Sequence, residues 1–230
     1  MSVLTRLLYY RPVIIGVCIP SLAAITLLLL RMVLTGDQEF WYMAWNLTLS
    51  IAAVLAGAAC LHYWRLRHSV SAAGFFLVWL FLLPNTFYML TDYIHVGQSG
   101  DINILFDIVM VGLFAMNGFF QGIVSLYFIH KKFIERFGAM NAHVAVAIII
   151  LASSFAVDMG RYLRLNSWDV LLNPRTLIFD LSDTFLNPGN YDRSFLVTAI
   201  FFIAIGSLYI GVWQCAGWLQ KPRSIRDFKK

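Results

Sequence analysis

Residues 81–95, FLLPNTFYMLTDYIH, combine an apolar start with four side chains that could do chemistry. These are the amide of Asn85, the phenol of Tyr88, the carboxyl of Asp92 and the imidazole of His95. They follow one another in steps of three, four and three residues, so one face of a helix would carry all four. A carboxylate and an imidazole can serve as base and acid in proton transfer. The pattern therefore predicts a candidate site at the end of an apolar helix.

The composition of the chain places this helix in a membrane. The chain has 230 residues, of which 60% are hydrophobic and 13% are charged, and its mean hydropathy is +0.74. Soluble domains carry about 25% charged residues. The net charge of +5 lies in the loops between apolar runs, not on a basic and aromatic surface, so we expect a lipid bilayer and no nucleic acid as partner.

Six apolar runs are long enough to span a membrane as helices. They cover roughly residues 13–34, 40–62, 70–91, 105–130, 141–160 and 194–219. The backbone must satisfy its own hydrogen bonds inside a bilayer, so a helical bundle follows. We therefore expect an all-α polytopic membrane bundle of six transmembrane helices, which forms a single domain over residues 1–230.

Lys and Arg residues set the expected orientation, because cytoplasmic loops carry an excess of them. With six spans, the N-terminus, the loops 63–69 and 131–140, and the C-terminal tail share one side, which holds twelve of the 17 Lys and Arg residues. The other side holds only Arg31, Arg161, Arg164, Arg175 and Arg193. We therefore expect both termini in the cytoplasm and the polar end of helix 70–91 on the outer side.

The longest loop, residues 161–193, is then also on the outer side. Within it, Asn173 can cap a helix that has Pro174 in its first position. A helix over residues 174–186 would be about 20 Å long, which is too short to span a membrane. We expect a short interfacial helix on the outer surface, either as a lid or as a connector that rests on lipid headgroups.

This topology brings polar residues of four helices into the outer half of the bundle. Asp92 and His95 end one helix, and Asp107 begins the next. In an enzyme, Asp92 or Asp107 would be the base, and His95 the acid or a ligand. The predicted substrate-binding residues are Asn46, Asn85, Tyr88, Arg161, Arg164, Asn166 and Asp169.

Two arginines of this set suit an anionic substrate, because Arg161 and Arg164 could hold a carboxylate or phosphate in forked hydrogen bonds. An enzyme of this kind would be a hydrolase or transferase for a lipid-linked or anionic small molecule at the outer leaflet. In the structural alternative, Asp92, Asp107, Asp158 and the two arginines form an ion-pair network that closes the bundle. Asp158 and Arg161 are three residues apart on one helix and could pair.

Residue types alone permit two cofactor sites. Asp92, His95 and Asp107 could form a metal site with two carboxylates and one histidine, although no HExxH or paired CxxC motif is present. His130 and His143 lie at similar depth on successive helices, so a haem could lie between them. Neither arrangement is indicated by a motif, and the cofactor stays unknown.

A second polar pattern runs along helix 105–130. Asp107, Asn117, Gln121 and Ser125 fall within an arc of about 80° and extend over most of the apolar core. Such a stripe could line a proton or solute pathway in a small transporter. It could equally provide hydrogen bonds between helices. A third class of function is a non-catalytic membrane partner that assembles with another protein.

Three strings of the sequence carry a family resemblance: PNTFYMLTDYIH, FDIVMVGLFAMNGFFQGIVSLYFIH and GRYLRLNSWDVLLNP. On these strings the chain resembles, over about residues 40–215, the domain of unknown function family 1361 of bacterial multi-pass membrane proteins. The resemblance implies a place in the bacterial cytoplasmic (inner) membrane. It carries no established activity, substrate or catalytic residue, so the predicted chemistry depends on the residues alone.

Overall fold

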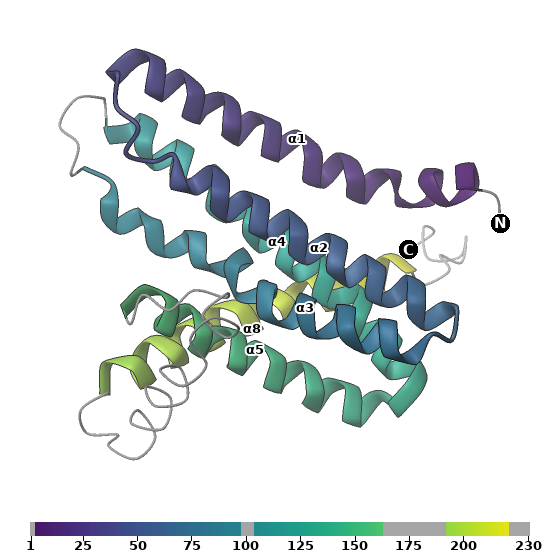
Figure 1. Ribbon diagram of the computed structural model, residues 1–230. Coiled ribbons are helices and arrows are strands. Elements are labelled where there is room, and N and C mark those ends of the chain that lie inside the picture. The colour runs from purple at the N-terminus through teal and green to yellow at the C-terminus, as the bar shows by residue number, and fades with distance from the viewer. Residues whose placement is uncertain (1–2, 98–103, 163–191, 221–230) are drawn as a thin grey trace, which may run out of the picture.

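The computed structural model describes residues 3–97, 104–162 and 192–220, which form helices and short turns (Figure 1). The helices are α1 (Val3–Thr35), α2 (Tyr42–Arg65), α3 (Ser69–Tyr88), α4 (Ile104–Phe137), α5 (Ala139–Tyr162) and α8 (Asp192–Gln220). A short 3₁₀ helix, η1 (Met89–His95), continues α3. Within these described residues, six helices are long and apolar enough to cross a membrane. The predicted all-α bundle with six spanning helices is confirmed, and the chain is a multi-pass membrane protein. The predicted interfacial helix over 174–186 lies outside the described residues.

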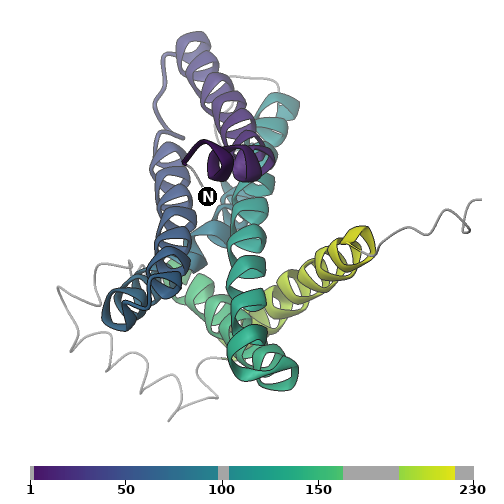
Figure 2. The same cartoon turned by 90° about the vertical axis from the view of Figure 1, so that its right-hand side faces the viewer.

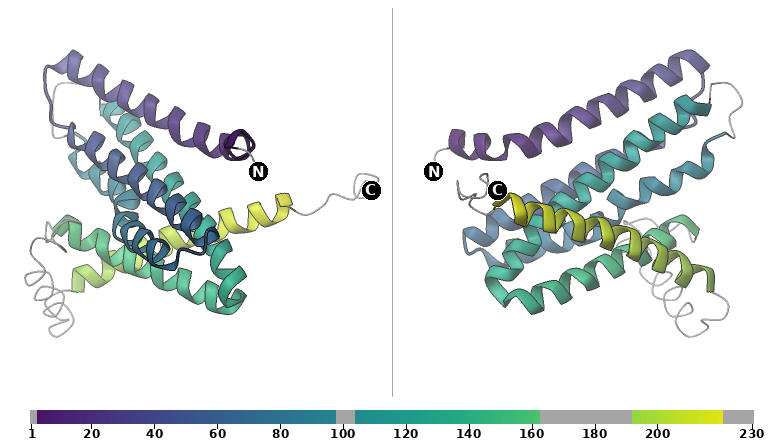
Figure 3. Two further views of the ribbon diagram at one scale, coloured as in Figure 1. Left: turned by 45° about the vertical axis from the view of Figure 1, so that its right-hand side comes forward. Right: turned by 180° about the vertical axis from the view of Figure 1, so that it is seen from behind.

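Helix α4 is the centre of the bundle. It contacts α1, α2, α3, η1, α5 and α8. The turned views show α1 on one side of α4, and α5 with α8 on the opposite side (Figures 2 and 3). This central position explains why α4 buries polar residues such as Asn117 and Gln121, which are 2% and 0% exposed.

The two ends of the bundle differ in their residues. The start of α1, the end of α8, and the α2–α3 and α4–α5 turns lie at one end (Figure 1). We call this the basic end, because Arg65, Arg67, Lys131, Lys132 and Arg136 belong to it. The opposite end is called the polar end and holds Arg31, Asp92, Asp107 and Arg161.

Helix α4 continues to Phe137, beyond the end predicted near residue 130. Its last turns leave the apolar part of the sequence, and Lys132 forms an ion pair with Glu135 at 2.7 Å. The helix ends where Gly138 takes a φ of +82°, a backbone conformation that glycine adopts readily. The charged extension of α4 thereby reaches the α2–α3 turn.

Two glycines of α4 allow α3 and η1 to approach closely. A Cβ atom at Gly118 would collide with the carbonyl oxygen of Thr86 and with the Met89 side chain. A Cβ at Gly122 would collide with the hydroxyl of Thr86 and the ring of Phe87. The GxxxG spacing of small residues thus fixes the end of α3 against α4, as close helix packing in membranes requires.

The α-helical backbone tightens into the 3₁₀ turns of η1 after Pro84, which cannot donate a backbone hydrogen bond. The hydroxyls of Thr86 and Thr91 donate to the carbonyls of Leu83 and Tyr88, both at 2.7 Å. Side-chain bonds of this kind compete with the regular helical pattern. Residues three apart are eclipsed in a 3₁₀ helix, so Asp92 and His95 face the same side.

Candidate functional site

The last turn of α5 places Arg161 against η1. Its Nη1 atom lies 3.3 Å from Oδ1 of Asp92, and its Nη2 atom lies 2.9 Å from Nε2 of His95. The ring of Tyr88 is 6.0 Å from the guanidinium carbon. Three of the four side chains that the spacing assigned to one face therefore surround one guanidinium. The fourth, Asn85, donates to the carbonyl of Leu82 at 3.2 Å and has a further interaction.

This geometry assigns hydrogen-bond roles to the two ring nitrogens of His95. Arginine has no hydrogen-bond acceptor, so Nε2 of His95 accepts the bond from Arg161. The imidazole is then neutral and carries its proton on Nδ1. Among the described residues Nδ1 has no hydrogen-bond partner, so His95 offers one N–H donor.

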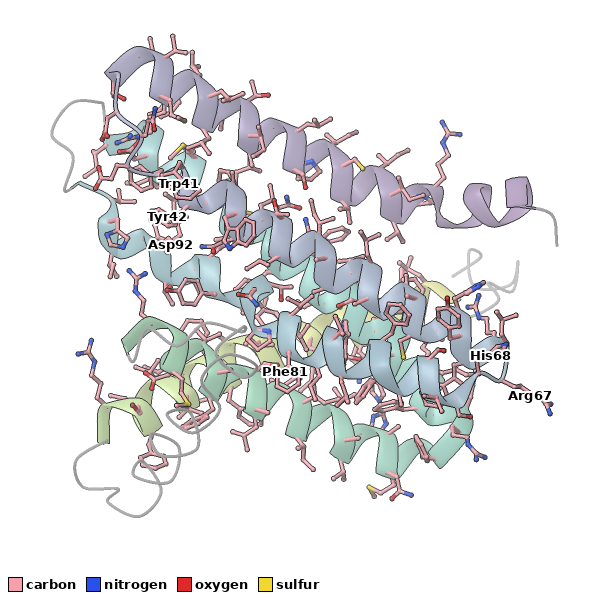
Figure 4. The ribbon with its side chains drawn as sticks, viewed as in Figure 1. Trp41, Tyr42, Arg67, His68, Phe81 and Asp92 are labelled. Atoms are coloured by element: carbon pink, nitrogen blue, oxygen red, sulfur yellow. The ribbon has the colours of Figure 1, made fainter. Side chains whose placement is uncertain are left out.

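Two buried oxygen atoms beside Arg161 also lack hydrogen-bond partners within the described part of the chain, namely Oδ2 of Asp92 and Oη of Tyr42. The Tyr42 ring packs edge-on against His95, with 6.1 Å between the ring centroids, and Figure 4 shows Tyr42 next to Asp92. Asn46 is close enough to form a hydrogen bond with the Asp92 carboxyl. Leaving a buried polar atom without a hydrogen bond costs about 1–3 kcal/mol of stability. A ligand that formed hydrogen bonds with these two oxygens would remove that cost, which would favour its binding. Tyr42, Tyr88, Asp92, His95 and Arg161 are called the Arg161 site below.

A second buried ion pair joins α1 to the first turn of α4. Nε of Arg31 lies 2.8 Å from Oδ1 of Asp107, and its Nη2 lies 3.4 Å from Oδ2. Arg31 is 1% exposed, and its guanidinium carbon lies 4.4 Å from the centroid of the Phe40 ring. The carboxylates of Asp37 and Glu39 are also near, at 3.9 and 4.0 Å. The Arg31 charge is therefore compensated within the protein.

The pairing of Asp107 with Arg31 corrects the predicted metal site. Asp92 and His95 contact Arg161, whereas Asp107 is held on α4 by an arginine of α1. Among the described residues no three His, Cys, Asp or Glu side chains are grouped so that they could hold a metal ion. Asp92, His95 and Asp107 thus do not form the predicted set, and the donor groups give no support for a metal.

The predicted pair between Asp158 and Arg161 is also wrong. Arg161 reaches across to η1, and Asp158 forms a hydrogen bond with Ser194 of α8 instead. Each side chain therefore has its partner on a neighbouring element and not on α5 itself. Three further predicted residues, Arg164, Asn166 and Asp169, lie outside the described residues.

The polar stripe of α4 is occupied by hydrogen bonds between helices. Nδ2 of Asn117 donates to Oγ of Ser21 at 2.9 Å, and Oγ of Ser50 donates to Oε1 of Gln121 at 2.7 Å. Nε2 of Gln121 in turn donates to Oδ1 of Asn117 at 3.1 Å. These bonds tie α1 and α2 to α4, as the structural interpretation of the stripe predicts.

The two histidines near the basic end contact each other directly. Nδ1 of His143 lies 2.9 Å from Nε2 of His130, and Nδ1 of His130 lies 2.6 Å from the hydroxyl of Tyr209. The ring of Trp213 stacks on His130 at 4.2 Å. A haem does not fit between two imidazoles that are hydrogen-bonded to each other, so that arrangement is excluded.

The sequence-based analysis missed two residues of the polar end. Arg31 entered only as a marker of orientation, although an arginine at the end of an apolar run on the side poor in positive charge indicates a buried partner. Tyr42 follows Trp41, and such an aromatic pair usually indicates a membrane interface. Neither residue has a local spacing that connects it to Asp107 or Asp92.

Comparison with known proteins identifies the family of the chain. No curated protein and no solved structure matches it. The family described as "Protein of unknown function (DUF1361)" matches residues 45–208, which is well over half of the 230 residues. The match includes Tyr88, Asp92, His95 and Arg161 and begins after Arg31 and Tyr42. As the strings PNTFYMLTDYIH and GRYLRLNSWDVLLNP predicted, the chain belongs to the DUF1361 family.

Proposed function

We propose that the protein is a membrane-embedded hydrolase or transferase whose Arg161 site takes a lipid-linked or anionic substrate. The observation that supports this proposal is the meeting of three different groups in one place. These are a buried carboxylate oxygen of Asp92 with no partner among the described residues, the Nδ1–H donor of His95, and the guanidinium of Arg161.

Each group has a role that its chemistry suits. Oδ2 of Asp92 is the base that takes a proton from the attacking water or hydroxyl group. The Nδ1–H of His95 donates a hydrogen bond to the leaving oxygen, which takes up the proton that Asp92 has accepted, so that both side chains return to their starting states. Arg161 uses two of its five N–H donors on Asp92 and His95, which leaves others for an anionic substrate or transition state. Asp107 is paired with Arg31, which is not part of the Arg161 site, so the proposal gives it no catalytic role.

The proposed location is the bacterial cytoplasmic membrane, with both termini in the cytoplasm and the Arg161 site on the outer side. The excess of Lys and Arg at the basic end supports this orientation. A fluorescent protein fused to the C-terminus should fluoresce, because it folds in the cytoplasm, whereas alkaline phosphatase fused there should be inactive. An active phosphatase fusion would show that the C-terminus is outside the cytoplasm, and the proposed orientation would be wrong.

The test of the activity compares membranes that contain the wild-type chain, Asp92→Asn or Asp158→Asn. Asp158 is a matched control, because it is equally buried and also has one oxygen without a partner among the described residues. Mass spectrometry of the lipids should find one species consumed in the presence of wild type and Asp158→Asn. Loss of the proposed base should slow this conversion by about 10²–10⁴-fold in Asp92→Asn.

Identical lipid profiles from all three membranes would count against an enzyme. The buried ion pairs would then only close the bundle. The transport alternative receives no support from the stripe of α4, because Asn117 and Gln121 are bonded to other helices.

A further inference from the structure

The basic end contains a groove of about 970 Å³ between the α2–α3 turn and the end of α4. Ligand sites have volumes of about 300–1,000 Å³, so this groove is at the upper end of that range. Its lining includes the aromatic residues Trp64, Phe76, Phe133 and Phe137. Four cationic residues also line it, and we call it the basic groove: Arg65, Arg67, Lys132 and Arg136.

The charges of the basic groove are unbalanced. Glu135 is bonded to Lys132 at 2.7 Å and compensates one of the four cations. Arg67 and Arg136 have exposed side chains, and among the described residues no salt bridge involves either of them. The groove thus presents a net positive charge beside an aromatic lining.

Arg67 has an unusual backbone conformation for its residue type. Its φ is +61°, in the left-handed region that favours glycine. Its N–H donates to the carbonyl of Trp64 at 3.1 Å, and the N–H of His68 donates to the carbonyl of Tyr63 at 3.0 Å. These two bonds form the helix-ending motif in which glycine is the usual residue. The turn would form more easily with glycine, and an arginine in its place adds a positive charge to the lining of the groove. Figure 4 shows the Arg67 side chain projecting from the α2–α3 turn.

The start of α3 adds to the positive potential of the groove. Ser69 and Ala72, in the first turn of this 20-residue helix, belong to the lining. His68 precedes them and makes no side-chain capping bond to the first N–H groups. Free N–H groups at a helix start, together with the helix dipole, favour an anion.

We propose that the basic groove binds the phosphate headgroup of an anionic membrane lipid. The groove lies at the ends of helices that are long and apolar enough to cross a membrane, so lipid reaches it laterally. The aromatic lining suits the upper part of the acyl chains, and the arginines suit the phosphate. Basic pockets between transmembrane helices bind such headgroups by the same combination of charge and apolar contact. This inference does not depend on the activity of the Arg161 site.

The experiment is a titration of the detergent-purified full chain with phosphatidylglycerol, followed by native mass spectrometry. The double variant Arg67→Gly/Arg136→Gln removes two charges from the groove. Its affinity for phosphatidylglycerol should fall roughly 30-fold (about 2 kcal/mol), and phosphatidylcholine should bind weakly to all variants. The double variant Arg11→Gln/Lys131→Gln removes two charges from the same end but outside the lining, and its affinity should change less than about 2-fold.

Thermal unfolding shows whether each variant is folded, and the single variant Arg136→Gln replaces the double variant if that one is not. An equal loss of affinity in both double variants would overturn the proposal, because general surface charge would then account for binding. Inorganic pyrophosphate provides a separate arm. If pyrophosphate bound to the groove in an Arg67-dependent way and phosphatidylglycerol did not, the ligand would be a soluble phosphate compound and the lipid assignment would be wrong.

Discussion

The polar end and the basic end of the bundle hold their arginines in opposite ways. At the polar end, Arg31 and Arg161 are 1% and 12% exposed, and each contacts a buried carboxylate. At the basic end, Arg67 and Arg136 are exposed at the rim of a groove whose described lining contains no Asp or Glu. A charge inside the apolar part of the bundle needs a partner from the same chain, because desolvation is expensive there. A charge at the end of a helix can stay hydrated and remain available to an external partner.

The two ends therefore offer complementary chemistry. The atoms without partners in the described part of the polar end include the carboxylate oxygen of Asp92 and the hydroxyl of Tyr42. The basic groove presents positively charged donors instead. Under the proposed function, a substrate of the Arg161 site would supply hydrogen-bond donors as well as an anionic group, whereas an anion alone would suit the basic groove.

The largest expected effect comes from breaking the arginine pair of the polar end. Asp107→Leu removes the closest carboxylate from the buried guanidinium of Arg31, and Asp37 and Glu39 are more distant at 3.9 and 4.0 Å. Loss of one partner of a buried pair costs about 3–5 kcal/mol, so the free energy of unfolding in mixed micelles should fall by about that amount. The double variant Arg31→Leu/Asp107→Leu should recover most of the loss. Equal destabilisation in both variants would show that packing, and not charge, accounts for the effect.

A smaller loss is expected when the support of η1 is disturbed. Gly118→Ala adds a methyl group where the carbonyl of Thr86 and the side chain of Met89 already lie. Overpacking of this kind costs about 1–3 kcal/mol and should lower the unfolding temperature. Gly74→Ala is the control, because no atom lies within 4 Å of its added Cβ. A Gly118→Ala variant as stable as Gly74→Ala would contradict the close approach of α3 and α4.

At the basic end the sign of the effect reverses. Arg67→Gly should raise the free energy of unfolding by about 1 kcal/mol, because glycine adopts a positive φ without strain. Gly138 has a φ of +82° at the end of α4, so Gly138→Arg is the reciprocal variant and should lower stability by a similar amount. Destabilisation by Arg67→Gly would mean that the arginine holds the turn, which would weaken its assignment to ligand binding.

The smallest change in stability is expected for the polar stripe of α4, which lies between the two ends of the bundle. Gln121→Ala removes the bonds to Ser50 of α2 and Ser21 of α1, but hydrogen bonds between helices in a membrane contribute only about 0.6 kcal/mol each. The unfolding temperature should therefore change little. If the free energy of unfolding fell by more than about 3 kcal/mol, the polar stripe of α4 would be a main source of stability and the expected small contribution would be wrong.

The sequence predicted well what depends on local spacing. The six apolar runs determined the helices, and the spacing of Tyr88, Asp92 and His95 correctly assigned them to one face. The tightening of η1 into a 3₁₀ helix kept Asp92 and His95 together, since a separation of three suits both helix types.

What the sequence could not determine is which helices are neighbours. Asp107 was grouped with His95 because both lie near helix ends on one side, but its partner Arg31 is 76 residues away on α1. The pairing of Asp158 with Arg161 followed from a separation of three residues, and contacts with α8 and η1 replaced it. The basic groove was missed for the same reason, because its lining joins the α2–α3 turn to the distant end of α4.

The bond between Arg31 and Asp107 has a consequence for the order in which the helices assemble during synthesis and membrane insertion. Helix α1 is synthesised before α4, yet α4 is the helix that it chiefly packs against, and the buried carboxylate 2.8 Å from Arg31 belongs to α4. Before α4 enters the bilayer, the carboxylates near Arg31 include the half-exposed Asp37 and Glu39, so α1 is expected to keep its arginine beside them at the water-facing edge of the membrane. Docking of α1 is therefore expected to be a late, post-insertion step, and a nascent chain truncated before Asp107 should expose Arg31 to water-soluble labelling reagents that the complete chain excludes.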